Sequence, residues 1–190
     1  MSHIEYETFG QELAFHTAPT LLGIKCGSLI SLQKDRFDIH THIRIFNGRA
    51  SGKSLKIRKL YDYKNRSLLL IYNEKLMKKR LADDDVRELL SCFGYSAGFS
   101  ADEYLQRLGV RLSENKTFPH EIGIFLDYPV EDVIGFMKNK GANYKLCGYW
   151  KVYGNEEKAR RTFANYVKCR NFLCNKLNQG IDLYQALKIS

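Results

Sequence analysis

A long amphipathic segment near the C-terminal end constrains the fold most strongly. Asn155 is a favourable helix N-cap, and Glu156 and Glu157 follow it where the helix dipole favours acids. The helix is expected to run to about residue 178, before Gly180. Helical spacing predicts that one stripe faces the core, with Arg170 as its charged exception; the other members are Ala159, Phe163, Tyr166, Leu173 and Leu177.

The rest of the chain alternates between helical and extended patterns. The first predicted helix covers residues 5–16, and Ala18-Pro19 is expected to end it. Further helices are predicted over 36–50, 129–141 and 182–188. Three others are predicted to begin at 73, before 86 and before 101. Strand patterns cover 21–32, 55–63, 67–72, 121–126 and 144–153. The turn Lys64-Asn65-Arg66 joins two of these strands into a hairpin.

This order of elements predicts the fold class. Strand, helix, strand and helix follow one another over 121–178, which suggests a parallel crossover pair, whereas the central hairpin is antiparallel. A length of 190 residues suits one domain, and a hydrophobic fraction of 44% is that of a folded globule. We expect an α/β (mixed α+β) single domain over 1–190, with a mixed β-sheet covered by helices and a long C-terminal helix.

Cysteine usage and the N-terminal residues point to a cytoplasmic protein. The five cysteines are scattered and contain no C-x-x-C pair, so neither a zinc ribbon nor a dithiol redox motif is expected; they are Cys26, Cys92, Cys147, Cys169 and Cys174. The first 13 residues carry three glutamates and lack the apolar core of a secretory signal. No apolar run approaches the roughly 18 residues that a membrane span needs.

The net charge of +9 is concentrated in one segment. Residues 49–80 contain eleven Lys and Arg against two acids, which equals the excess of the whole chain. Such a segment favours either a solvated basic surface or a surface that binds nucleic acid or another polyanion. No recognised nucleic-acid-binding motif accompanies it.

The sequence from Gly48 to Ser54 resembles a phosphate-binding P-loop but does not satisfy its geometry. A P-loop has four residues between its outer glycines, and here three separate Gly48 from Gly52. The predicted elements are also in the reverse order, with a helix before the loop and a strand after it. A glycine-broken turn from helix to strand explains this segment.

Three segments together resemble a known family. They are LAFHTAPTLLGIK at 13–25, FPHEIGIFLDYP at 118–129 and CGYWKVY at 147–153. The family is an uncharacterised bacterial one, a domain of unknown function found mostly in anaerobic Gram-positive bacteria. The resemblance covers nearly the whole chain, more loosely over 37–95, and implies a single-domain protein without an assigned activity. Asp127 stands where this family is expected to have glycine.

Ionisable and aromatic residues in these motifs are the candidate site. His16, at the predicted end of the first helix, is either a metal ligand or base, or a cap of the helix carbonyls. His120 and Glu121 are adjacent at the start of a predicted strand, so one is expected to face a pocket while the other pairs with a basic residue. They lack the H-E-x-x-H spacing of a zinc site.

The third motif places Cys147, Tyr149 and Lys151 on one face of a predicted strand and Trp150 on the other. Cys147 is either a structural cysteine or a nucleophile activated by a nearby positive charge or imidazole. His40 and His42 lie on different faces of a predicted helix, so they do not share a metal.

Three hypotheses of function follow. The first is a small-molecule-binding or accessory protein, with a pocket built from the three motifs. The second is a thiol- or metal-dependent enzyme whose candidate catalytic or metal-binding residues are His16, His120 and Cys147. The third is polyanion binding through residues 49–80. The sequence identifies no cofactor and no oligomeric state.

Overall fold

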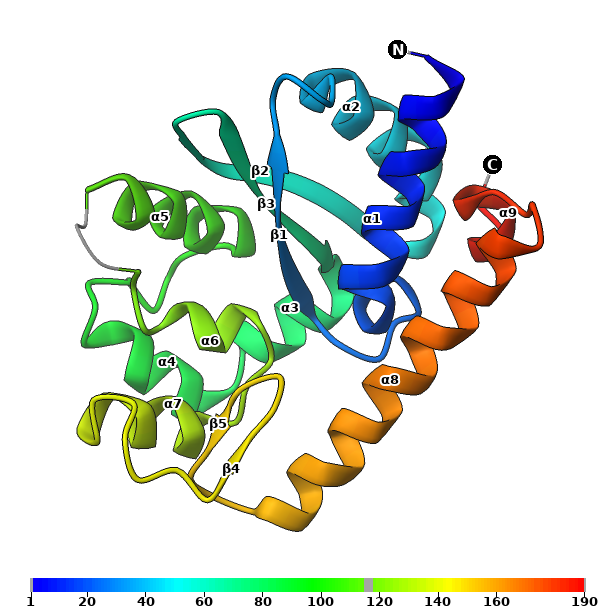
Figure 1. The fold of residues 1–190 in the computed structure, drawn as a ribbon. Coiled ribbons are helices and arrows are strands. Elements are labelled where there is room, and N and C mark those ends of the chain that lie inside the picture. Colours follow the sequence, from blue (N-terminus) through cyan, green and yellow to red (C-terminus); the bar gives the residue numbers. More distant parts are fainter. Residues whose placement is uncertain (1, 115–117, 190) are drawn as a thin grey trace.

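An antiparallel sheet of three strands separates two hydrophobic cores. The computed structural model describes residues 2–114 and 118–189, and Figure 1 shows its arrangement. The strand order is β1 (Gly27–Gln33), β3 (Arg66–Asn73), β2 (Leu55–Tyr63), with β3 in the middle. Neighbouring residues of a strand face opposite sides, so Leu69 and Ile71 of β3 enter one core while Leu70 and Tyr72 enter the other.

The first core lies between the sheet and the two ends of the chain. Helix α1 packs on β1, on β3 and on the long helix α8, which runs beside it in Figure 1. The short 3-10 turn η1 (Ser51–Lys53) leads into β2. The helices of this face are α1 (His3–Leu21), α2 (Ile39–Ala50), α8 (Glu156–Asn178) and α9 (Leu183–Leu187).

The second core fills the opposite face of the sheet. Its helices are α3 (Glu74–Leu81), α4 (Asp84–Ser91), α5 (Ala101–Glu114), α6 (Ile122–Phe125) and α7 (Val130–Lys138). A small hairpin of β4 (Leu146–Cys147) and β5 (Lys151–Val152) follows α7 and leads into α8. A third apolar cluster, of Trp150, Val152, Ala159 and Tyr166, joins this hairpin to α8.

The fold class and most helix starts are confirmed. Helices and strands are mixed, helices cover the sheet, the hairpin forms, and α8 matches the expected long C-terminal helix. Asn155 caps α8 by accepting from the Lys158 N–H at 2.9 Å, and Ser100 with Glu103 forms the expected cap of α5. The cap of α4 is Asp83, two residues before the predicted Asp85.

Two predicted strands are wrong, and so is the parallel pair. Residues 121–126 form the turn of helix α6, because Ile124 N–H bonds to the Glu121 carbonyl and Leu126 N–H to that of Ile122. A short run of buried apolar residues fits either element, so periodicity could not separate them. Residues 144–153 fold back at Gly148 into the β4–β5 hairpin. All strand pairs among the described residues are antiparallel.

Pro19 does not end the first helix, which continues to Leu21. Proline at this position removes the hydrogen bond that its own N–H would make and crowds the carbonyl four residues earlier. Residues 17–21 are all buried, so packing against the sheet and α8 outweighs that loss. Within the described residues, no helix combines the length and apolarity needed to cross a membrane.

Gly27 allows β1 to approach α6, and this contact predicts the effect of a substitution. A Cβ at Gly27 would lie 2.3 Å from the Phe125 carbonyl oxygen, which is backbone and cannot move aside alone. We expect Gly27→Ala to lower the free energy of unfolding by about 1–3 kcal/mol, measured by urea denaturation. Gly48→Ala is the control: its Cβ meets nothing within 4 Å, and alanine favours helix α2 by about 0.5–1 kcal/mol. Equal effects of the two would contradict this account.

Candidate functional site

The carboxylate of Asp132, in the first turn of α7, holds the end of the β4–β5 hairpin. Its Oδ2 accepts from the Trp150 indole N–H at 2.7 Å, and its Oδ1 accepts from the backbone N–H groups of Tyr153 and Gly154, each at 2.7 Å. Asp132 is only 3% exposed. These charge-assisted hydrogen bonds compensate the burial of the carboxylate and set the position of Trp150.

Aromatic rings pack around Trp150. Its ring stacks on Tyr128 with centroids 5.1 Å apart and meets Phe163 of α8 edge-on at 4.5 Å. Tyr149 meets Tyr166 of α8 edge-on at 5.1 Å. A Cβ on Gly148 would lie 2.3 Å from the Phe163 ring, so glycine is needed for this packing. The CGYW part of the third motif therefore serves to place an aromatic hairpin on α8.

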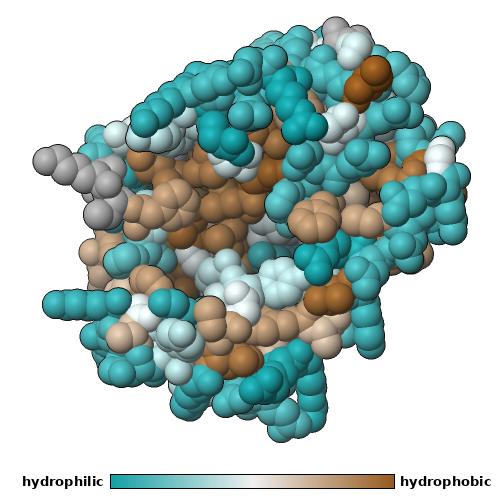
Figure 2. Space-filling model, viewed as in Figure 1, coloured by the Kyte–Doolittle hydropathy of each residue, from teal (hydrophilic) through white to brown (hydrophobic). Residues whose placement is uncertain are grey.

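A first cavity, of about 450 Å³, lies between α6, α7 and β5. This volume is in the range of small-molecule sites. Figure 2 shows hydrophobic side chains gathered in the middle of the face that Figure 1 presents, framed by hydrophilic ones. Apolar and aromatic side chains dominate the lining, which comprises Phe118, Pro119, His120, Ile122, Gly123, Tyr128, Asp132, Val133, Phe136, Trp150 and Lys151.

Two basic side chains line this apolar cavity. Lys151 Nζ donates to the Gly141 carbonyl at 2.7 Å and lies 5.8 Å from the centroid of the Phe136 ring. An ammonium has three donors, and this is its one hydrogen bond within the described residues. The His120 ring meets the same Phe136 ring edge-on at 5.2 Å. Lys151 therefore retains donors for an acceptor and belongs to the lining of a mainly apolar cavity.

His120 and Glu121 point in different directions, although they lie in a turn and not on a strand. His120 lines the first cavity. Glu121 is fully buried in the second core, where it forms an ion pair with Arg111 and accepts from the Tyr95 hydroxyl at 3.5 Å. Glu121 is therefore a structural partner of α5, and His120 alone of this pair faces the cavity.

The structure does not bring His16 and Cys147 to this cavity. His16 lies inside α1, five residues before its end, and its Nε2 is 3.5 Å from Glu12 Oε2 on the exposed side of the helix. Cys147 is exposed on β4, opposite Lys151 on β5, and bonds to no histidine within the described residues. Among residues 2–114 and 118–189, no three His, Cys, Asp or Glu side chains form a group that could hold a metal. A His16, His120 and Cys147 centre is thus not formed there.

A second cavity, also of about 450 Å³, shares Asp132 and Trp150 with the first. Trp150 thus stands between two spaces of different chemistry. The second cavity is polar, and acids outnumber basic residues in its lining, which comprises Ile24, Arg80, Asp83, Asp85, Asp127, Pro129, Val130, Glu131, Asp132, Trp150, Asn155, Lys158, Ala159, Thr162, Asn165 and Tyr166.

The amine of Lys25 lies beside this second cavity. Its Nζ is 5.5 Å from the centroid of the Tyr128 ring and 5.4 Å from that of the Tyr166 ring. Lys25 is 6% exposed, and within the described residues its amine makes neither a hydrogen bond nor a salt bridge. Burial lowers the pKa of Lys25 to about 8, and the Asp127 carboxylate opposes that shift only in part.

Asp127 explains where the chain departs from the expected glycine. Its φ is +62°, a left-handed conformation that glycine adopts freely and aspartate tolerates. The carboxylate uses this position: Oδ2 accepts from the Cys26 N–H at 3.1 Å, and Oδ1 lies 3.8 Å from Arg80 Nε. Arg80 also donates to the Tyr128 carbonyl at 2.5 Å. The turn therefore ties α3 and the start of β1 together next to Lys25.

Sequence reasoning did not single out Lys25, Tyr128, Asp132, Phe136 or Tyr166 as site residues. Tyr166 was expected only in the apolar stripe of the long C-terminal helix. One signal was available for Lys25, since it follows the apolar run Leu21-Leu22-Gly23-Ile24 directly before a strand. A lysine in such a run is either at the surface or buried with a lowered pKa.

The basic segment 49–80 is distributed over the end of α2 and over η1, β2, β3 and α3. Four of its cations form ion pairs: Lys56 with Glu74, Arg58 with Asp102, Lys59 with Asp62, and Arg80 with Asp127. Polyanion binding by the remaining charges stays a hypothesis.

These features define a class of protein: an antiparallel sheet between two helical layers, with an aromatic hairpin that separates two cavities. The chain belongs to the family described as a protein of unknown function (DUF3793), whose model matches residues 13–187. The resemblance to an uncharacterised family is therefore confirmed. No curated protein and no solved structure matches the chain.

Asp132→Asn tests the role of the buried carboxylate. The amide retains one acceptor oxygen and brings a donor towards the Trp150 N–H or the backbone N–H groups, so at least one donor loses its partner. We expect the free energy of unfolding to fall by about 2–4 kcal/mol, since a hydrogen bond to a charged group contributes roughly 1.5–3 kcal/mol. Urea denaturation followed by the fluorescence of Trp150, the single tryptophan, measures this. Asp84→Asn, at a 99% exposed side chain, should change little, and a similarly small change at Asp132 would contradict the assignment.

Lys25→Met tests the buried amine through pH. Because its folded pKa is about 8 and its ordinary value 10.5, the folded protein binds fewer protons than the unfolded chain between these values. The free energy of unfolding of the wild type therefore rises across that window, by about 3 kcal/mol in total, and the cost of the buried charge is full below pH 8. Methionine carries no such cost.

We therefore expect the stability of Lys25→Met relative to wild type to decrease from pH 7 to pH 10.5. Urea denaturation of both proteins at both pH values gives this difference in the free energy of unfolding. The other titrating groups are the same in the two proteins, so their contributions cancel. Lys168→Met, at an exposed lysine of α8, should show the same difference at both. A pH-independent difference for Lys25→Met would show that its amine titrates normally.

Proposed function

We propose that this protein binds a small ligand in the first cavity, one with an apolar, planar body and an anionic or carbonyl oxygen. The observation that carries the proposal is a cavity of about 450 Å³ with aromatic walls and one lysine in its lining that retains hydrogen-bond donors. Apolar walls with few, well-placed polar groups are typical of small-molecule sites. Residues of the second and third family motifs form much of the lining.

The residues have separate roles in this proposal. Apolar contact with the ligand comes from Phe136, Val133 and Trp150. The Tyr128 ring stacks on Trp150 and helps to fix its position. Lys151 donates a charge-assisted hydrogen bond to the ligand oxygen, and its position is held by the Gly141 carbonyl. His120 also lines the cavity, and its ring N–H is a second donor.

The proposed setting is the cytoplasm. All five cysteines are unpaired, which suits a reducing compartment. Binding without chemistry is favoured over catalysis at this cavity, because Asp132, the carboxylate in the lining, is engaged by the Trp150 indole and two backbone N–H groups, and the lining formed by the described residues contains no serine, threonine or cysteine.

The fluorophore 1-anilinonaphthalene-8-sulfonate tests the proposal, since it combines an aromatic body with an anionic group. Excitation of Trp150 should be transferred to the bound dye. We expect Lys151→Met to weaken binding roughly tenfold or more, because a charge-assisted hydrogen bond contributes about 1.5–3 kcal/mol. Titration of the dye at constant protein measures the dissociation constant.

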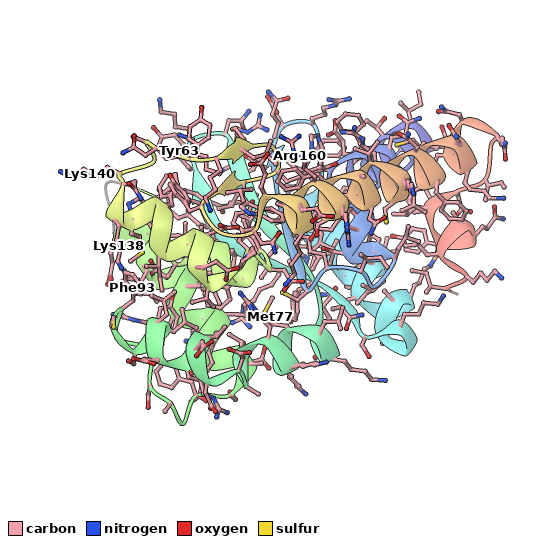
Figure 3. The ribbon with its side chains drawn as sticks, turned by 90° about the horizontal axis from the view of Figure 1, so that it is seen from below. Tyr63, Met77, Phe93, Lys138, Lys140 and Arg160 are labelled. Atoms are coloured by element: carbon pink, nitrogen blue, oxygen red, sulfur yellow. The ribbon has the colours of Figure 1, made fainter. Side chains whose placement is uncertain are left out.

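Two controls separate charge from packing. Lys138→Met removes a lysine of α7 that lies at the outer edge of the molecule in Figure 3 and outside the cavity; it should leave binding unchanged. The neutral dye N-phenyl-1-naphthylamine should bind Lys151→Met about as well as wild type. Absence of energy transfer from Trp150, or equal losses in the two lysine variants, would overturn the proposal.

A further inference from the structure

The second cavity presents a different chemistry that is independent of the first. Ile24, Asp127 and Tyr166 all line this space. Lys25 follows Ile24 in the chain, its amine lies 5.4 Å from the centroid of the Tyr166 ring, and it is within electrostatic range of Asp127. Lys25 itself is outside the lining, and its amine lies next to the Tyr166 ring, which borders this space of about 450 Å³.

We propose that Lys25 is a carbonyl-reactive lysine, whose amine forms an imine with a small neutral aldehyde or ketone that enters through the second cavity. Within the described residues the Lys25 amine has no hydrogen bond or salt bridge, and its neighbours are the rings of Tyr128 and Tyr166, so no carboxylate or carbonyl blocks its lone pair. Lys25 lies two residues before β1, and its side chain is buried.

Burial also supplies the reactive form of the amine. The nucleophile is the uncharged amine, and desolvation lowers the pKa of Lys25 to about 8. At pH 7.5 the uncharged fraction is then on the order of one hundred times that of an ordinary lysine. Surface lysines of the chain provide an internal reference for this difference.

The reaction needs no oxidant, reductant or cofactor. The lone pair of Nζ forms a bond to the carbonyl carbon, and the π electrons of the carbonyl move to its oxygen, which takes up a proton. Loss of the hydroxyl as water then gives the C=N bond, so one water is released for each imine. The protonated imine is a cation, and the two tyrosine rings that flank Nζ stabilise a cation at that place.

The charges of the lining select the class of carbonyl compound. Five acids line the cavity, Asp83, Asp85, Asp127, Glu131 and Asp132, against the two cations Arg80 and Lys158. Arg80 is already engaged by Asp127 and by the Tyr128 carbonyl. The excess of negative charge disfavours an oxo acid and favours a neutral compound.

Reductive trapping tests the proposal on the intact protein. Glycolaldehyde is added at pH 7.5 with sodium cyanoborohydride, which reduces an imine to a stable secondary amine, and each modified lysine is quantified by peptide mass spectrometry. We expect Lys25 to be labelled at least tenfold faster than exposed Lys168. The larger uncharged fraction of its amine raises the rate by more than the lower nucleophilicity of a less basic amine reduces it. Labelling of Lys25 no faster than of Lys168 would overturn the proposal.

Glyoxylate, an aldehyde that carries a carboxylate, is the second arm. Relative to Lys168 in the same sample, Lys25 should prefer glycolaldehyde. A preference for glyoxylate would overturn the assignment of a neutral ligand.

A pair of variants in α8 tests the route through the cavity. Thr162 lines the second cavity and Ala164 is exposed outside it, so Thr162→Trp should fill the space while Ala164→Trp should not. We expect Thr162→Trp to slow labelling of Lys25 at least tenfold and Ala164→Trp to leave it unchanged, with circular dichroism confirming that both fold. Fast labelling in both variants would show that carbonyl compounds do not reach Lys25 through this cavity.

These outcomes are separable from those of dye binding, because the dye depends on Lys151 and the labelling on Lys25. Either proposal can fail while the other holds.

Discussion

The buried carboxylate of Asp132 is the interaction on which the site depends. It lies in the first turn of α7 and receives three hydrogen bonds, one from the Trp150 indole and two from the backbone of the chain that leaves β5. A buried carboxylate is stable when its oxygens are satisfied in this way. By holding Trp150, it creates the partition between an aromatic cavity and a polar one, since both residues line both spaces.

The sheet provides the second constraint, because it brings remote segments together. The start of β1 packs on α6, so that Cys26 Sγ lies 3.6 Å from the Phe125 carbonyl and the Cys26 N–H reaches Asp127. Lys25 directly precedes Cys26. These contacts therefore hold its amine between the ring of Tyr128 and that of Tyr166, which is on α8. Its lowered pKa is thus a consequence of the route of the backbone, which buries most of the side chain.

The sequence predicted the elements whose ends are determined locally. Asn73, Ser100 and Asn155 cap helices as expected, and the hairpin of β2 and β3 forms around its turn. It did not predict α6 or the β4–β5 hairpin, where a short apolar run or an aromatic run fits more than one conformation and packing decides. Of the proposed site residues, His120, Trp150 and Lys151 line the first cavity, whereas His16, Glu121, Cys147 and Tyr149 are outside its lining.

The sequence by itself determined the fold class, the long C-terminal helix and membership of an uncharacterised family, because capping, periodicity and motifs are local properties of the chain. Only the tertiary structure decided which side chains share a cavity and which carry perturbed charges. A cavity is enclosed by segments far apart in the chain, and the pKa of Lys25 depends on water excluded by Tyr128 and Tyr166. Desolvation of this kind leaves no periodic signal in the residues around Lys25.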